Sequence, residues 1–306
     1  MNFGELLMAN SSFGDEIDPK GKKKPPTIGD EMKVLARRNL KYDNKNSLDL
    51  ARSASKYSGV NPALLLSSAY QEGMNQAVSK QGVSEAYAAA KVPSDYPVDA
   101  FFHYGIDSFS DYLPSIKQYL PKDFTEDRYK VFPASNEVDE KTWAKQNIPL
   151  LQQQGLLPKN FEFDFYKNME DVYNASDKYK GKVPLSKMAQ SAHPAAFKTN
   201  EDALIVKAAI LKSTMNEIDQ YAKKKGLVLD DESRNYFTLA RYNASPKTSY
   251  AMIDEFAAAK DKKAFLKQGV YKNKYAGGVH KNISPRIESM GVAQSLLDEP
   301  QIPITQ

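Results

Sequence analysis

The sequence predicts an all-α fold, and three observations support this prediction. Apolar residues recur at helical spacing in several segments, most clearly between residues 201 and 225. Residues that typically start and stop helices flank these segments. The chain shows neither a convincing set of alternating strands nor an internal repeat of about 20 to 50 residues, which argues against a sheet protein and against a solenoid.

The first three helices are expected before residue 74. One runs from about 30 to 38, and the next from about 47 to 57, with Gly59 as its stop signal. The third starts at Asn61-Pro62, because Asn caps helices and Pro is favoured at the first helical position. Gly73 closes this third helix.

The middle of the chain is less regular. Prolines recur throughout residues 92–165, and prolines at this density interrupt the hydrogen-bond ladders of sheets. We therefore expect short helices joined by turns. Residues 101–111 stand out as a dense aromatic segment with a glycine at its centre.

The later part of the chain gives the clearest pattern. A long helix is predicted over 201–225, with Thr199 or Asn200 as its cap, acids in its first turn and lysines in its last. Further helices are expected from Asp230 or Asp231 to about 243, from about 247 to 260, and from Ser284-Pro285 onward.

Three regions follow from this pattern. Residues 1–28 are polar and rich in helix breakers, so they are predicted to form a flexible N-terminal arm. Residues 29–298 are predicted to form one domain. Residues 299–306 contain two prolines and are expected to form a short C-terminal tail.

Composition excludes several chemistries. The chain has no cysteine, which removes disulfides, thiol nucleophiles and cysteine-based metal sites. The three histidines, His103, His193 and His280, lack the helical i, i+4 spacing of zinc ligands. No metal and no cofactor are therefore expected.

Charge and hydropathy limit the partners. A net charge of +4 is small for a nucleic-acid-binding protein of 306 residues, so nucleic acid is not an expected partner. No apolar run approaches the roughly 20 residues of a membrane span. The first residues include an acid and only a short apolar run, so no signal peptide is expected.

Glu72 is the first candidate functional residue. Helical spacing places it on one face with Leu65, Ser68 and Ala69, a stripe that is expected to pack inward. A carboxyl group in such a place must be partnered, protonated or lining a cleft. For an arbitrary sequence, a glutamate near a helix end is more often simply solvated.

A second signal lies far along the chain. Tyr242-Asn243-Ala244 closes the helix that begins near residue 230. Tyr104 and Asp107 in the aromatic segment are further candidates. Each has an ordinary structural interpretation: a packed ring for either tyrosine, a C-terminal cap for Asn243, and a turn residue for Asp107.

The two signals together resemble the lysozyme-like superfamily, in particular soluble lytic transglycosylases and goose-type lysozymes encoded by phages. In that family a glutamate ends an apolar helix, as Glu72 does, and a Tyr-Asn motif ends a later helix. The segment 104–109 is similar to a Gly-Leu-Asp segment of some large phage enzymes. The chain departs from the family pattern at Gly73, where serine is usual, and it lacks a Gly-Leu-Met-Gln segment.

The resemblance implies an enzyme that cleaves the β-1,4 bond between N-acetylmuramic acid and N-acetylglucosamine in peptidoglycan. Glu72 would act as general acid and then as base, and Tyr242, Asn243, Tyr104 and Asp107 would bind the glycan. Acid catalysis of this kind needs a carboxyl pKa raised toward neutrality, which apolar surroundings supply. Whether the enzyme is a transglycosylase or a hydrolase stays open.

The resemblance also implies a context. A phage protein without a signal peptide would be made in the host cytoplasm and would reach the wall in the virion or at lysis. The alternative is a non-enzymatic virion protein that keeps a degenerate lysozyme-like fold and docks to other virion proteins through its N-terminal arm.

Overall fold

A computed structural model describes residues 26–74, 95–106, 109–131, 148–161 and 195–300, and helices dominate these ranges. The all-α prediction is therefore confirmed at the level of a mostly helical fold. The named helices are α2 (Ile28–Leu35), α3 (Ser47–Ser58), α4 (Pro62–Glu72), α6 (Ala100–Tyr104), α7 (Phe109–Ile116), α10 (Asn200–Lys224), α11 (Asp231–Asn243), α12 (Pro246–Ala258), α13 (Lys262–Gln268) and α14 (Lys274–Asp298).

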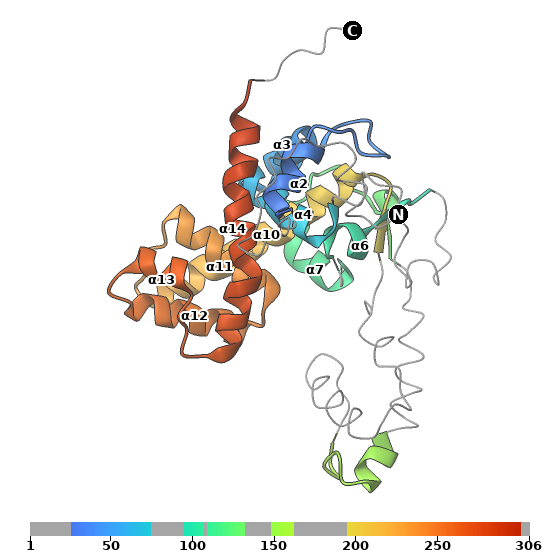
Figure 1. Ribbon diagram of the computed structural model, residues 1–306. Helices are drawn as coiled ribbons and strands as arrows, with labels where there is room; N and C mark the ends of the chain where they lie inside the picture. The colour runs from blue at the N-terminus through green and yellow to red at the C-terminus, as the bar shows by residue number, and fades with distance from the viewer. Residues whose placement is uncertain (1–25, 75–94, 107–108, 132–147, 162–194, 301–306) are drawn as a thin grey trace, which may run out of the picture.

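Two long helices organise the molecule. Helix α10 packs against α3 on one side and α11 on the other, and α14 packs against α2 and α4 and also against α11 and α12. Figure 1 shows α11, α12 and α13 grouped on one side of α14, with α2, α3 and α4 on the other. Helix α4 contacts both long helices, α10 and α14.

Local capping explains where α4 begins and ends. The Asn61 side chain accepts a hydrogen bond from the backbone N–H of Ala63, and Pro62 occupies the first helical position. Gly73 ends the helix with a φ of 118°, a left-handed conformation that favours glycine. Both predicted boundaries of this helix are confirmed.

A small antiparallel sheet departs from the sequence-based expectation. Its strands are β1 (Val98–Asp99), β2 (Tyr129–Val131) and β3 (Ala195–Phe197), in the order β1-β3-β2. Two of them lie in the proline-rich region that was expected to contain helices and turns only. Strands of two or three residues are too short to show an alternating pattern, so sequence periodicity does not detect them.

This sheet places two helices of the site. Strand β1 leads directly into α6, and β3 leads into α10 through the cap Thr199. Val98 and Tyr129 both pair with Phe197, whose ring packs edge-on against Phe109 with 5.5 Å between ring centroids. The sheet thereby holds the start of α6 beside the strand that leads into α10, and these two helices are in contact.

The last helix begins earlier than predicted. Helix α14 starts at Lys274, with Asn273 as its cap, and continues through Pro285, which was expected to start it. Proline removes one helical donor. The carbonyl of Lys281 therefore receives no hydrogen bond from residue 285. Lys281 and Pro285 are both exposed, so water can donate to this carbonyl in place of the missing N–H. Helix α13 was not predicted.

Described contacts lie at both ends of the predicted domain. Helix α2 begins at Ile28, and the side chains of Thr27 and Asp30 form a reciprocal capping box. At the other end, Glu299 forms an ion pair with Arg37. Residues 1–25 of the arm and 301–306 of the tail lie outside the described residues.

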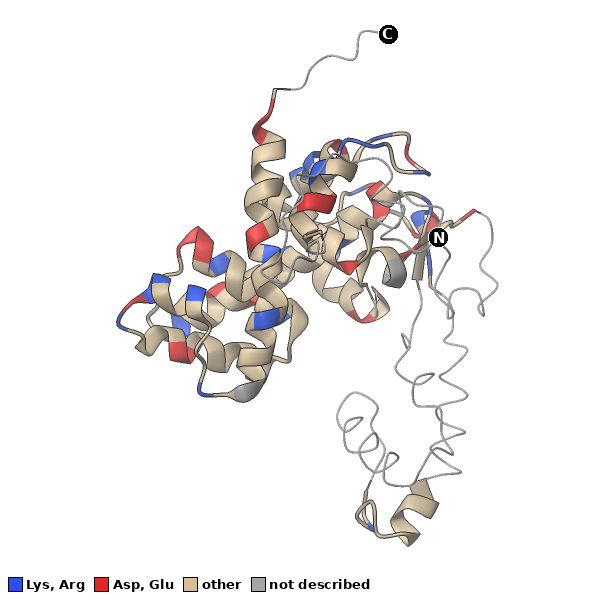
Figure 2. Cartoon of the chain, in the orientation of Figure 1, with Lys and Arg blue, Asp and Glu red and all other residues tan. Residues whose placement is uncertain are grey.

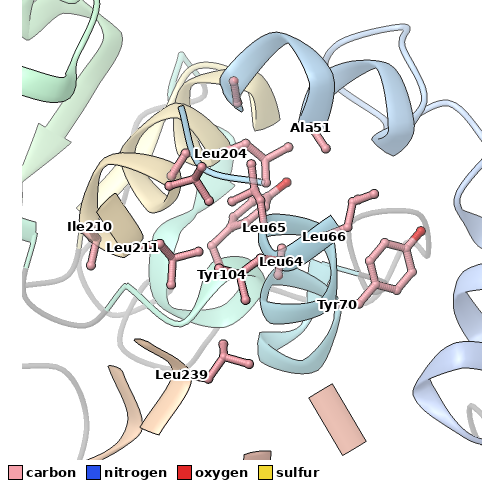
Figure 3. Close-up of a cluster of buried hydrophobic side chains, with 14 of the residues drawn as sticks. Ala51, Leu64, Leu65, Leu66, Tyr70, Tyr104, Leu204, Ile210, Leu211 and Leu239 are labelled. Carbon is pink, nitrogen blue, oxygen red and sulfur yellow. The ribbon is translucent and has the colours of Figure 1, made fainter. Parts of the chain in front are cut away.

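One apolar core joins the helices. It includes every residue of α4 from Ala63 to Tyr70 except the two serines, together with the apolar face of α10. Figure 3 shows Tyr104 inside this cluster with Leu65, Leu204 and Leu211. Residues 148–161 hold a separate small cluster, formed by Ile148, Leu151 and Leu157.

Two global features bear on possible partners. Among the described residues, no helix is both long enough and apolar enough to cross a membrane. Figure 2 shows lysine and arginine interspersed with aspartate and glutamate over the described helices.

Candidate functional site

Glu72 lies at the C-terminal end of α4, where the buried helix reaches the surface. Leu65, Ser68 and Ala69 on the same face have no exposed surface, as the helical spacing predicts. The Glu72 side chain itself is 23% exposed. The carboxylate therefore sits at the boundary between core and solvent, with one side reachable from outside.

Arg286 of α14 is the charged partner of Glu72. Its Nη2 donates to Oε1 of Glu72 over 2.5 Å, and its Nε donates to Oε1 of Gln71 over 2.6 Å. The arginine is buried. A buried guanidinium needs a counter-charge, so this ion pair fixes the direction of the Glu72 carboxylate.

Gly105 lies against the other side of the Glu72 side chain. A Cβ atom added to Gly105 would come within 2.5 Å of Oε2 of Glu72. The backbone at Gly105 has a φ of 63°, and Ile106 N donates to Ala100 O over 3.0 Å to close the turn after α6. Glycine is required here both by the left-handed backbone and by the close approach of the carboxylate.

Tyr242 reaches the same glycine from α11. Its hydroxyl donates to the Gly105 carbonyl oxygen over 2.9 Å. Glu72 and Tyr242, which are far apart in the sequence, therefore meet at Gly105. Tyr242 contacts Gly105 through this hydrogen bond, and Glu72 contacts it through the close approach of its side chain.

Lys207 of α10 completes the support of the turn. Its Nζ donates to the Tyr104 carbonyl oxygen over 2.9 Å and to the Tyr242 hydroxyl over 2.8 Å. The residue has no exposed surface. The turn at residues 104–105 is thus held by α10 and α11 while Glu72 of α4 packs against it.

The other predicted site residues have different positions. Tyr104 is completely buried, its hydroxyl donates to Asn200 over 2.7 Å, and burial raises its pKa well above the usual value. This contradicts the expectation that its ring contacts a glycan. The Asn243 side chain donates to the Leu239 carbonyl one turn earlier over 2.7 Å, a contact within the end of its own helix. Asp107 lies outside the described residues.

Two residues of the site were missed by sequence reasoning. Lys207 follows Ala203 and Leu204 at helical spacing, so it falls on the apolar face of α10, and a lysine in that position is a usable signal. Arg286 lies similarly between Ile283 and Met290. In both cases a charged residue within an apolar stripe marks a buried polar contact.

The described residues contain no group of three or more histidine, aspartate or glutamate side chains arranged to hold a metal ion. Comparison of the chain with known protein families, with curated proteins and with solved structures gave no match. The site is therefore interpreted from its own geometry.

Proposed function

We propose that the protein cleaves the β-1,4 bond between N-acetylmuramic acid and N-acetylglucosamine in peptidoglycan, as a lytic transglycosylase of lysozyme-like fold. The observation that carries the proposal is the meeting of Glu72 and Tyr242 at Gly105. The sequence resemblance implies that these two residues share a site, whereas their local sequences alone do not predict this.

The reaction needs a single carboxyl group that acts twice. Protonated Glu72 donates its proton to the glycosidic oxygen as the bond to C1 of the muramic acid breaks. The carboxylate that results takes the proton of the C6 hydroxyl as O6 bonds to C1, which closes a 1,6-anhydro ring. A partly exposed carboxylate in a fixed orientation suits both steps.

Substitution of the acid tests the proposal. Purified wild-type protein is expected to clear isolated cell-wall sacculi, and Glu72→Gln is expected to lose at least about 100-fold of that rate, because general acid–base catalysis contributes about that much or more. Glu217→Gln is the matched control, since Glu217 also forms a partly buried ion pair, with Arg241 over 2.8 Å.

The control should keep the wild-type rate, and thermal unfolding should show both variants folded. If wild type and Glu72→Gln clear the wall equally, or if neither clears it, the enzymatic proposal fails.

The products identify the second step. We expect mass spectrometry of the released muropeptides to find 1,6-anhydromuramic acid ends, because Glu72 alone completes the reaction. Reducing ends would instead show that a water molecule was activated, as in a muramidase, which usually employs a second acid. That result would show that the protein is a hydrolase of the same bond and not a transglycosylase.

A second candidate function is a non-enzymatic virion protein that uses a lysozyme-like fold as an interaction module. One observation favours it: the buried Arg286 needs a counter-charge, and Glu72 supplies it, so a structural role alone accounts for the position of this acid. In this case the N-terminal arm, residues 1–28, would dock to neighbouring virion proteins. Wild-type protein would then leave sacculi intact.

A further inference from the structure

Arg286 is attached to α4 by its backbone as well as by its side chain. The Ser67 hydroxyl donates to the Arg286 carbonyl and lies 2.7 Å from the Ser289 hydroxyl. The guanidinium then reaches the end of α4 and bonds to Gln71 and Glu72. Two independent sets of contacts therefore fix the arginine relative to the helix that carries the acid.

The burial of Arg286 is energetically unfavourable in one respect. Its Nη1 is buried and has no hydrogen-bond partner among the described residues. An unsatisfied buried donor costs free energy, and a buried ion pair is often no more stable than well-packed apolar residues of similar volume. Stability alone therefore gives a weak reason for an arginine at this position.

We propose that Arg286 is a positioning residue for the reaction of Glu72. This inference rests on the proposed glycan cleavage. The guanidinium occupies Oε1 of Glu72, so Oε2, which faces Gly105, is the oxygen left to exchange protons with the substrate. It also stabilises the carboxylate that forms when Glu72 gives its proton to the glycosidic oxygen.

Other elements packed against α4 also carry titratable groups. Helix α10 contributes Lys207, which bonds to Tyr104 and Tyr242 rather than to Glu72. Helix α6 contributes His103, whose pKa is lowered by burial, and α2 contributes Glu31, whose charge acts on Tyr70. Among the described residues, Arg286 is the charged group that bonds directly to the Glu72 carboxylate.

The test compares kcat and KM of sacculus clearing for wild-type protein and Arg286→Met. A residue that only orients the acid acts on the chemical step and not on glycan binding, so we expect KM to stay unchanged. The maximal rate should fall about tenfold or more, because the carboxylate loses its orientation and its stabilisation.

Two further variants complete the experiment. Arg286→Lys keeps a positive charge but cannot hold Gln71 and Glu72 with one planar group, so its maximal rate should fall by a smaller amount. If Arg286→Met does not fold, Arg286→Lys provides the test of the positioning role. Arg241→Met removes a partly buried arginine paired with Glu217 and should leave kcat and KM unchanged.

The outcomes separate the two proposals. If wild-type protein is active, Glu72→Gln is inactive and the Arg286 variants keep the wild-type maximal rate, then Arg286 is structural and the positioning role is overturned. If wild-type protein does not clear sacculi at any pH, the proposed function fails and the role of Arg286 fails with it.

Discussion

Gly105→Ala is expected to abolish sacculus clearing although it changes neither the acid nor any charge. The added methyl would lie within 2.5 Å of Oε2 of Glu72 and within 2.8 Å of its Cδ and Cγ. Contacts this short force the carboxylate or the turn to move. Because Oε2 is the oxygen assigned to proton transfer, either movement removes it from its position relative to the substrate.

The same substitution is expected to destabilise the fold. Alanine in a left-handed conformation costs about 1 to 2 kcal/mol, and steric overlap inside a packed region adds about 1 to 3 kcal/mol. The free energy of unfolding should therefore fall by about 2 kcal/mol or more, as measured by urea denaturation with an unchanged m-value.

Gly226→Ala is the matched control for this prediction. Gly226 has a φ of 68°, close to the 63° of Gly105, but no atom lies within 4 Å of its added Cβ. It should lose only about 1 to 2 kcal/mol and keep full activity. Equal stability and equal activity of the two variants would show that the Glu72 side chain does not pack against Gly105.

The helices that were predicted accurately owe their boundaries to local interactions. Asn61, Pro62 and Gly73 act on their own backbone or on residues within one turn. The boundaries of α4 can therefore be predicted from the sequence. Helix α14 was misplaced because its cap, Asn273, precedes a stretch with two glycines, whereas Ser284-Pro285 mimics a start signal. Its path through Pro285 depends on packing against α4, which no local pattern encodes.

The candidate site was predicted only in part, for a related reason. The direction of Glu72 follows from helical spacing, and the pairing with Tyr242 was suggested by resemblance. The connection between them is a backbone carbonyl, that of Gly105, and any residue type supplies a carbonyl. Contacts made through main-chain atoms leave no signature in side-chain patterns, which is why the role of Gly105 emerged only from the structure.

Lys207→Ala is expected to be among the most destabilising single substitutions in the chain. Lys207 is completely buried, and its Nζ donates to the Tyr104 carbonyl and the Tyr242 hydroxyl. Truncation to alanine leaves a cavity in the core beside α6 and α11, and it removes a donor from buried acceptors. Cavities from large-to-small changes cost about 2 to 5 kcal/mol, and unsatisfied buried polar groups cost about 1 to 3 kcal/mol.

We therefore expect Lys207→Ala to lower the free energy of unfolding by about 3 kcal/mol or more, measured by urea denaturation. Lys207→Met keeps most of the volume and removes only the polar contacts, so its loss should be smaller. Lys212→Ala, on the same helix but half-buried, should change stability by no more than about 0.5 kcal/mol. If Lys207→Ala is as mild as Lys212→Ala, the lysine does not hold the turn on which Glu72 rests.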